Sequence, residues 1–220
     1  KKFNLSSKSV FSLNSLGINT NRDVWVYNFS KDNLKTNTKN LVEFYNKEVE
    51  HWCNIKNTDK TVKPEDVISY DKTKISWSSS LVSNLQRGNC AKYEQDMIFD
   101  SMYRPFIKQH LYNGDKMIHR PCQWKEIFPQ TIQNNLCICI SSDVRNGFSC
   151  LISQKIPDLS YVAACQCFPL YYYDKNEGNI GILFDQGKEN YTRHDGITDF
   201  ILGQCRERYG FKVQKEDIFY

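Results

Sequence analysis

The sequence lacks the short motifs that mark several common enzyme families. Its six prolines are never adjacent, which excludes the Asn-Pro-Pro-Tyr or Asp-Pro-Pro-Tyr loop with which amino-methyltransferases hold a flipped base. The Gly187-Lys188 pair is followed by Glu and has no Gly five residues before it, so it cannot belong to a phosphate-binding P-loop. His-Glu-x-x-His, Gly-x-Ser-x-Gly and Gly-x-Gly-x-x-Gly are also absent. We therefore expect these 220 residues to hold neither a catalytic centre nor a cofactor.

The sequence also lacks a long apolar run. No stretch approaches the roughly 18 apolar residues of a membrane span, and the N-terminal residues have neither an initiator Met nor the apolar core of an export signal. These features predict a cytoplasmic protein with no membrane partner. The chain closes on an apolar-aromatic run, residues 216–220, without a Gly, Pro or polar tail, and we expect it to be a segment of a longer polypeptide.

Cysteine is present, but not in the pattern of a disulfide-rich secreted domain. The nine cysteines are odd in number and irregularly spaced, which indicates reduced thiols. Two pairs, Cys137-x-Cys139 and Cys165-x-Cys167, raise the alternative of a four-thiolate zinc site. Zinc knuckles usually separate their ligands by two to four residues, and these pairs lie in apolar runs, so we favour buried thiols over zinc.

The composition is that of a folded domain with a slight excess of positive charge. A hydrophobic fraction of 40%, including 14% aromatic residues, is enough for a sizeable core. The formal net charge of +4 is compatible with a polyanionic partner but does not require one.

The first part of the chain reads as a strand followed by amphipathic helices. Alternation over Asp23 to Phe29 predicts a half-buried strand. A helix capped by Ser30 or Asp32 should follow, because apolar residues recur at helical spacing from Leu34 to Trp52. Residues 54–74 should form a loop with a short helix after Pro64, and residues 78–87 a second short helix.

The second part reads as short strands at close spacing. The predicted strands cover residues 98–103, 110–112, 117–119, 136–141, 148–153, 163–173 and 181–185. A last helix is predicted over Gly196 to Tyr209, before Gly210. The fold class is therefore α+β with a mostly antiparallel sheet, divided into residues 1–92 and a β-rich part, residues 93–220, that together form one compact unit.

Basic and aromatic residues are interleaved between Tyr103 and Trp124. Arginine or lysine on a rigid strand edge can grip a phosphate or bind guanine, so this segment predicts DNA contacts from Arg104, Lys108, Tyr112 and Arg120. The alternative is structural: the two arginines pair with carboxylates of the domain, and Tyr112 is a core residue.

A polar loop between two apolar strands is the second candidate for a DNA contact. Hydroxyl, amide and guanidinium groups in residues 141–147 are of the kind that read base edges. The predicted contacts here are Ser141, Ser142, Arg145, Asn146 and, in the next turn, Lys155. The alternative is a solvated hairpin tip.

Several short runs resemble the C-terminal specificity region of the single-chain Type ISP restriction-modification enzymes. In chain order they are Gly17 to Asp23, Ile75-Ser76-Trp77-Ser78, Tyr103-Arg104-Pro105-Phe106, Leu111-Tyr112, Arg120-Pro121, Phe168-Pro169-Leu170-Tyr171 and Glu216 to Tyr220. Ile107 departs from the pattern, because an Asp commonly follows the Tyr-Arg-Pro-Phe run in that family.

The resemblance implies a target-recognition domain that selects a double-stranded DNA site. In such enzymes other domains of the same polypeptide, a nuclease, an ATP-driven translocase and an adenine-N6 methyltransferase using S-adenosylmethionine, do the chemistry, and the longer enzyme is expected to use Mg²⁺ as well. Two alternatives stay open: a coupling module that contacts the other domains and never touches bases, and, less favoured because the motifs are missing, a stand-alone hydrolase or nuclease.

Overall fold

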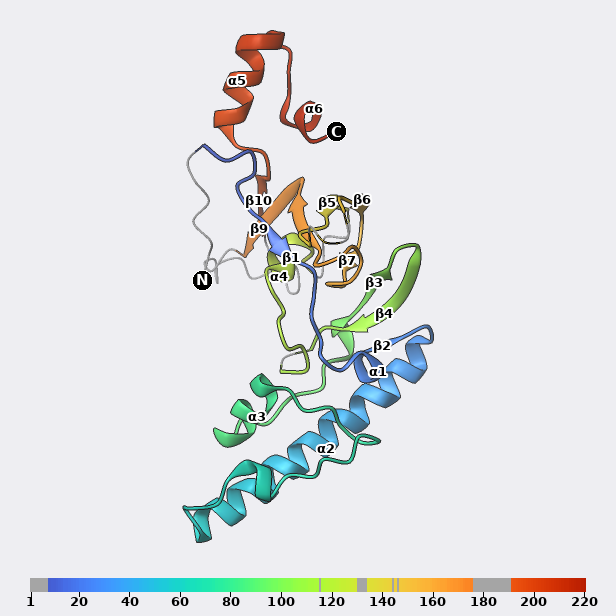
Figure 1. The fold of residues 1–220 in the computed structure, drawn as a ribbon, viewed down its shortest axis with the longest axis vertical. Helices are drawn as coiled ribbons and strands as arrows, with labels where there is room; N and C mark the ends of the chain where they lie inside the picture. Colours follow the sequence, from blue (N-terminus) through green and yellow to red (C-terminus); the bar gives the residue numbers. More distant parts are fainter. Residues whose placement is uncertain (1–7, 115, 130–133, 144, 146, 176–190) are drawn as a thin grey trace, which may run out of the picture. The chain divides into compact units, whose positions relative to one another are not determined.

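The computed structural model describes residues 8–114, 116–129, 134–143, 145, 147–175 and 191–220. The chain forms two compact units, which we call the inserted unit (Ile18–Pro121) and the flanking unit (Lys1–Gly17 with Cys122–Tyr220). Helices and antiparallel strands occur in both, so the predicted α+β class is confirmed (Figure 1). These boundaries differ from the predicted boundary between residues 92 and 93. The reason is that residues 110 and 111 pair with residues 27 and 28, across the predicted boundary.

The inserted unit combines a three-stranded antiparallel array with helices. Its elements are α1 (Asp23–Val26), β2 (Tyr27–Asn28), α2 (Lys31–Thr58), η1 (Pro64–Asp66), α3 (Ser79–Gln86), η2 (Gln95–Met97), β3 (Ile98–Arg104) and β4 (Ile107–Tyr112). The strands lie in the order β2, β4, β3, with Tyr27 opposite Leu111 and Phe99 opposite the same residue from the other side.

Helix α2 follows from its sequence. The Ser30 hydroxyl caps it by accepting a hydrogen bond from the Asn33 amide. One stripe of the helix is buried and packs against α3 and β4. The buried residues are Leu34, Thr38, Leu41, Val42, Tyr45, Val49 and Trp52. The predicted helix, the short turn after Pro64 and the helix over residues 78–87 are thus confirmed, although α2 continues to Thr58, into the predicted loop.

The strand predicted over Asp23 to Phe29 is only partly correct. Its first half is the helical turn α1, and only Tyr27 and Asn28 pair as β2. The Thr20 hydroxyl donates to the Asp23 carboxylate, and the Trp25 amide donates to the Arg22 carbonyl at 2.9 Å. These local bonds stabilise a turn that the polar-apolar alternation does not reveal.

The flanking unit holds most of the strands. Its elements are β1 (Ser15–Leu16), α4 (Trp124–Ile127), β5 (Cys137–Ile140), β6 (Cys150–Ser153), β7 (Ile156–Pro157), β8 (Gln166–Pro169), β9 (Tyr171–Lys175), β10 (Tyr191–Asp195), α5 (Asp199–Tyr209) and α6 (Lys215–Phe219). An antiparallel sheet runs in the order β1, β8, β5, β6, and β9 pairs with β10. Cys139 lies directly opposite Cys167.

A small apolar cluster joins the C-terminal helices to the strands of the flanking unit. Leu170, Ile197 and Phe219 are its buried members. The predicted last helix is confirmed as α5, which begins at Asp199 because the Thr198 hydroxyl accepts from the Ile201 amide. No helix among the described residues is both long enough and apolar enough to span a bilayer.

Three predicted strands need comment. The strand predicted over residues 163–173 is two strands, β8 and β9, which belong to different sheets. Residues 117–119 are wrong as a strand: they form a turn, because the Met117 carbonyl accepts a hydrogen bond from the buried Arg22 guanidinium rather than from a neighbouring strand. Residues 181–185 lie outside the described residues.

Candidate nucleic-acid interface

The turn between β3 and β4 presents an aromatic side chain flanked by two basic residues. The pairing of β3 with β4 shifts its register between Met102 and Arg104, and Arg104 lies opposite Ile107. The two strands are therefore joined by a tight turn at Pro105 and Phe106. Phe106 has φ +64° and is 88% exposed, an unusual backbone conformation and exposure for a large apolar residue. Lys108, on the other side of the turn, is exposed and faces Met102 in the register.

Arg104 is braced within the inserted unit. Its guanidinium lies 3.9 Å from the centre of the Tyr103 ring and 3.7 Å from the Asp23 carboxylate, and it donates to the Tyr103 carbonyl at 2.6 Å. The Tyr103 hydroxyl donates to the same Asp23 carboxylate at 3.1 Å. These contacts agree with the structural alternative, in which Arg104 pairs with a carboxylate of the domain.

Tyr112 is a core residue. Its side chain is fully buried and stacks on Tyr93 with 5.5 Å between ring centres. Its hydroxyl accepts a hydrogen bond from the Glu94 amide and donates to the Lys92 carbonyl. Burial raises the pKa of Tyr112. The structural alternative applies to this residue too, and we leave it out of the candidate surface.

Arg120 is an exposed residue on a fixed backbone. Its amide and carbonyl bond the carbonyl and amide of Asn19 at 2.9 and 3.4 Å. The preceding turn is held by Arg22, which sequence reasoning missed as a positioning residue. The Arg22 guanidinium donates to the carbonyls of Ser76 and Met117 and to the Ser78 hydroxyl. A lone Arg beside a Thr-Asn turn carries no signal of this role in the sequence.

The polar loop after β5 is fixed by its two serines. The Ser141 hydroxyl donates to the Gly147 carbonyl at 2.8 Å and accepts from the Ser149 amide at 3.1 Å, which closes the loop. The Ser142 hydroxyl donates to the Ala164 carbonyl at 2.6 Å. Both hydroxyls thus already use their proton inside the flanking unit, and a ligand would meet them as acceptors.

Arg145 projects from this loop with a defined orientation. Its Nε and Nη2 donate to the two Asp143 oxygens at 2.9 and 2.8 Å, and its side chain is 86% exposed. Hydrogen bonds from Arg145 lower the pKa of Asp143. The guanidinium N–H groups that bind Asp143 are also the groups with which an arginine binds guanine. Asp143 therefore orients Arg145, but Arg145 must release Asp143 before it can bind a base. Asn146 lies outside the described residues.

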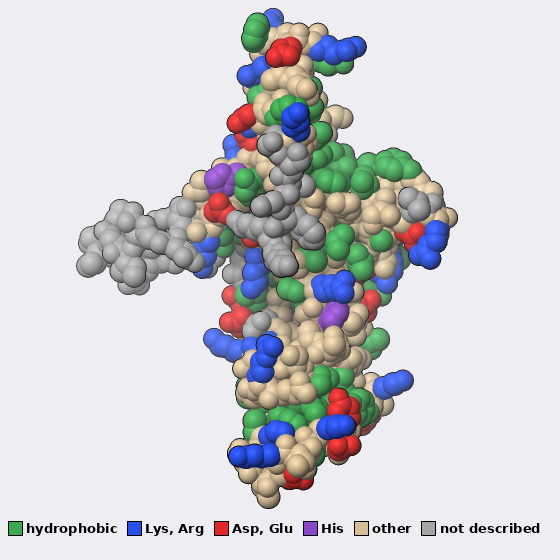
Figure 2. All heavy atoms as spheres, turned by 60° about the vertical axis from the view of Figure 1, so that its left-hand side comes forward, with side chains coloured by type: hydrophobic (Ala, Val, Ile, Leu, Met, Phe, Trp, Pro, Cys, Tyr) green, Lys and Arg blue, Asp and Glu red, His purple; other side chains and the backbone are tan. Residues whose placement is uncertain are grey.

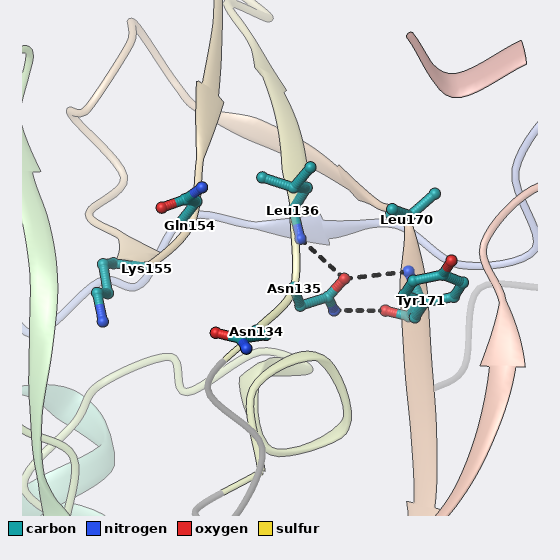
Figure 3. Close-up of a pocket in the computed structure, with 7 residues that line it drawn as sticks. All are labelled: Asn134, Asn135, Leu136, Gln154, Lys155, Leu170 and Tyr171. Atoms are coloured by element: carbon teal, nitrogen blue, oxygen red, sulfur yellow. Dashed lines mark hydrogen bonds between the residues drawn. The ribbon is translucent and has the colours of Figure 1, made fainter. Parts of the chain in front are cut away.

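A pocket of about 310 Å³ opens between β6, β9 and the residues before β5 (Figure 3). Its lining residues are Asn134, Asn135, Leu136, Gln154, Lys155, Leu170 and Tyr171. The Asn135 amide is saturated: it donates to the carbonyls of Ile127 and Tyr171 and accepts from the amides of Leu136 and Tyr171. Asn135 therefore shapes the pocket, whereas the exposed Asn134 and Gln154 amides and Lys155 border it.

The candidate residues fall into one set on each unit. Lys108 and Arg120 are exposed on the inserted unit, and Arg145 and Ser142 are exposed on the flanking unit, where Lys155 is half-buried at the pocket. Figure 2 shows blue Lys and Arg side chains interspersed with red Asp and Glu side chains over the face that it draws.

The family model described as Type ISP C-terminal specificity domain matches residues 9–220. Among curated protein sequences none matches this chain.

Three similar solved structures are complexes with DNA. The DrdV–DNA complex, solved by cryo-electron microscopy, has a TM-score of 0.76 and 26% identity over 96% of this chain and 19% of its own. A nuclease-deletion mutant of the Type ISP restriction-modification enzyme LlaGI, in complex with a DNA substrate mimic, has a TM-score of 0.70 and 32% identity; the match covers 86% of this chain and 14% of its own. The ATP-dependent Type ISP restriction-modification enzyme LlaBIII bound to DNA has a TM-score of 0.77 and 28% identity; the match covers 99% of this chain and 13% of its own. This chain thus spans less than a fifth of each of those proteins.

Proposed function

Because this chain belongs to the Type ISP C-terminal specificity domain family, we propose that it selects the double-stranded DNA sequence on which a longer restriction-modification enzyme acts. The observation that carries the proposal is the likeness of almost the whole chain to parts of three enzymes solved with DNA. A specificity domain of this kind needs exposed groups for phosphates and groups of defined orientation for base edges. Both kinds occur among the described residues.

The division of labour that we propose follows the exposure of the side chains. Lys108 and Arg120 would bind phosphates, because both are exposed on rigid backbone next to strand pairing. Arg145 would read a base edge in the major groove, because a planar, oriented guanidinium fits guanine O6 and N7. Gln154 and Asn134 beside Lys155 are further candidates for adenine, whose N6 and N7 match a side-chain amide.

The chemistry would belong to the rest of the longer polypeptide. We propose that methyltransferase and translocase domains adjoin this chain and bind S-adenosylmethionine, ATP and Mg²⁺, and that this chain presents the target adenine to them by base flipping. The motifs for those activities are missing from these 220 residues, which supports this assignment. An enzyme that acts on cellular and invading DNA would work in the cytoplasm.

The first prediction concerns binding to duplex DNA. A library of duplexes with a randomised central segment, selected on the chain and sequenced, should converge on one site. We expect that site to be bound at least roughly 1,000-fold more tightly than unselected duplex. Log K should fall with log salt with a slope of about −0.9 for each phosphate contact. A chain that gives a salt-dependent affinity but no preferred sequence, or no binding at all, would be a coupling module instead.

The second prediction concerns Arg145. Arg145→Ala should weaken binding to the selected site by about 1 to 3 kcal/mol, roughly 5- to 150-fold, and relax the preference at one base pair. Lys47→Ala removes the same charge from an exposed position of α2 and is the matched control. Competition titrations with single-base variants of the site measure both effects. Equal weakening on every sequence would assign Arg145 to a phosphate.

Asp143 provides an independent check of the same contact. Asp143→Asn removes the carboxylate that holds Arg145 and its repulsion of DNA phosphates. Affinity for unselected duplex should therefore rise while the ratio of selected to unselected affinity falls. If both affinities stay as in the unaltered chain, the loop of residues 141–147 does not meet DNA.

A further inference from the structure

Three cysteine side chains meet in the interior of the flanking unit. The Sγ atoms of Cys139 and Cys167 are 3.7 Å apart, and those of Cys165 and Cys167 are 3.3 Å apart. All three sulfurs lie within 4.8 Å of one another, and all three residues are fully buried. The arrangement brings three potential metal-ligand atoms together in the core.

The backbone around this triangle is fixed from several sides. Cys139 and Cys167 are direct partners in the pairing of β5 with β8. Cys165 follows a turn in which Ala164 has φ +50°, a strained conformation for a residue with a side chain. The Cys165 amide donates to the Leu159 carbonyl, and its carbonyl accepts from the Gly17 amide, both at 2.9 Å. The turn therefore holds Cys165 against the sheet.

We propose that Cys139, Cys165 and Cys167 bind one thiophilic metal ion, Zn²⁺ or Cu⁺, as a structural site. A tetrahedral Zn²⁺ with Zn–S bonds of about 2.3 Å places its sulfurs about 3.8 Å apart, close to the 3.7 Å between Cys139 and Cys167. A ligand set of sulfur alone selects these ions over Mg²⁺ and Ca²⁺. Cys137, buried two residues before Cys139 on the same side of β5, does not belong to the group of sulfurs within 4.8 Å and would have to move to supply a fourth ligand. Each thiol that is still protonated releases its proton to solvent on binding.

The sequence favoured apolar thiols because Cys-x-Cys is not a zinc knuckle. What the spacing cannot show is that the two pairs lie on neighbouring strands in a register that sets Cys139 opposite Cys167. The ligands thus come together through sheet pairing rather than through a local loop.

The site would brace the loop of residues 141–147. Ser142, three residues after Cys139, donates its amide to the Ala163 carbonyl at 3.1 Å and its hydroxyl to the Ala164 carbonyl, next to Cys165. A metal ion that joins Cys139 to Cys165 would tie the start of the loop to this turn. The effect on DNA recognition rests on the proposed function, but metal binding itself does not.

Metal binding is tested on the reduced chain, first stripped with a chelator. After Zn²⁺ is added back and the excess is removed by gel filtration, we expect elemental analysis to find about one Zn²⁺ per chain. Co²⁺ in its place should give thiolate-to-cobalt charge-transfer absorption. Added Zn²⁺ should raise the melting temperature, because it binds the folded state. If the chain takes up one Cu⁺ but no Zn²⁺, the three-thiolate site stands with copper as its ion. If it takes up neither, the proposal is wrong, whatever the DNA experiments show.

Variants locate the ligands. Cys139→Ala, Cys165→Ala and Cys167→Ala should each weaken Zn²⁺ binding by at least about 100-fold. Ala is chosen because it keeps these buried positions small and apolar. Cys53→Ala and Cys90→Ala, at half-buried and exposed thiols, are the matched controls and should bind as the unaltered chain does. Circular dichroism selects the variants that fold. A folded triple variant that still binds one Zn²⁺, or a disulfide among these cysteines in the chain purified without reductant, would overturn the proposal.

Discussion

Gly196→Ala should lower the free energy of unfolding of the flanking unit by about 3 to 5 kcal/mol, the combined cost of a steric clash and of two disturbed hydrogen bonds. A Cβ at residue 196 would lie 1.9 Å from the Pro169 carbonyl oxygen and 2.9 Å from that of Leu170. Both obstacles are backbone, so neither can turn aside as a flexible side chain would. The corner between β8 and β9 would have to move.

The hydrogen bonds at Gly196 make that movement expensive. Its amide donates to the Leu170 carbonyl and its carbonyl accepts from the Ser12 amide, both at 2.7 Å. The next residue, Ile197, is a buried member of the cluster that holds the C-terminal helices. Displacing the backbone here would therefore loosen the N-terminal segment and α5 together.

Gly203→Ala is the matched control for this substitution. Gly203 lies inside α5, where a Cβ meets nothing within 4 Å, so Ala should stabilise the helix by about 0.5 to 1 kcal/mol. Urea unfolding followed by Trp124 fluorescence in a chain with its other tryptophans replaced by Phe compares the two variants. Equal midpoints for Gly196→Ala and the parent would show that the corner is more compliant than the contacts indicate.

Arg22→Ala should destabilise the inserted unit by about 3 to 4 kcal/mol, because it strips several buried acceptors of a charged donor at once. Arg22 is 2% exposed, and its donors reach the carbonyls of Ser76 and Met117 and the Ser78 hydroxyl. Ser78 in turn caps α3. The substitution would therefore loosen the turn at residues 116–120 and the start of α3 together.

The charge of Arg22 is not what stabilises the fold. Burial lowers its pKa to about 10, below its value in the unfolded chain, so the folded state holds this proton less tightly. The burial of the cation therefore lowers the free energy of unfolding at a pH below about 10. This loss of stability shrinks as the pH rises from the pKa of the folded state toward the pKa of the unfolded state. Stability must come from the hydrogen bonds and from packing.

Hydrogen exchange read by mass spectrometry suits this prediction, since peptides from α3 and from residues 116–120 report the loss locally. Arg87→Ala, at an exposed position after α3, is the control and should leave exchange unchanged. Arg22→Lys keeps the charge without the planar fork and should recover only part of the protection. Full protection in Arg22→Ala would refute the assigned role.

The elements that the sequence predicted well are those set by local periodicity. The stripe from Leu34 to Trp52 and the cap at Ser30 depend on neighbours within a few residues. The turn α1 was missed because side-chain bonds at Thr20 and Asp23 override a strand-like alternation. The boundary between the units was missed because it depends on the pairing of β2 with β4, which is remote in sequence.

The candidate site shows the same limit. Composition was enough to identify the segment from Tyr103 and the loop after β5 as rich in side chains of the kind that can bind DNA. It could not separate Tyr112, which is buried, from Lys108, which is exposed, because residues two or four apart on a strand can differ in burial at its end. Nor could it find the ion pair between Arg104 and Asp23. The hydroxyl of the neighbouring Tyr103 donates to the same carboxylate, and Tyr103 and Asp23 are 80 residues apart in the sequence.

The discontinuity of the flanking unit has a consequence for how the chain is made. Ser15 and Leu16 form the edge strand β1, but their partner β8 comes only after the whole inserted unit. On the ribosome β2, β3 and β4 can pair once Tyr112 has emerged, whereas β1 waits for β8, which is not yet translated. Pairing at such sequence separation is slow to form. The unpaired edge of β1 therefore stays exposed during synthesis until β8 has emerged.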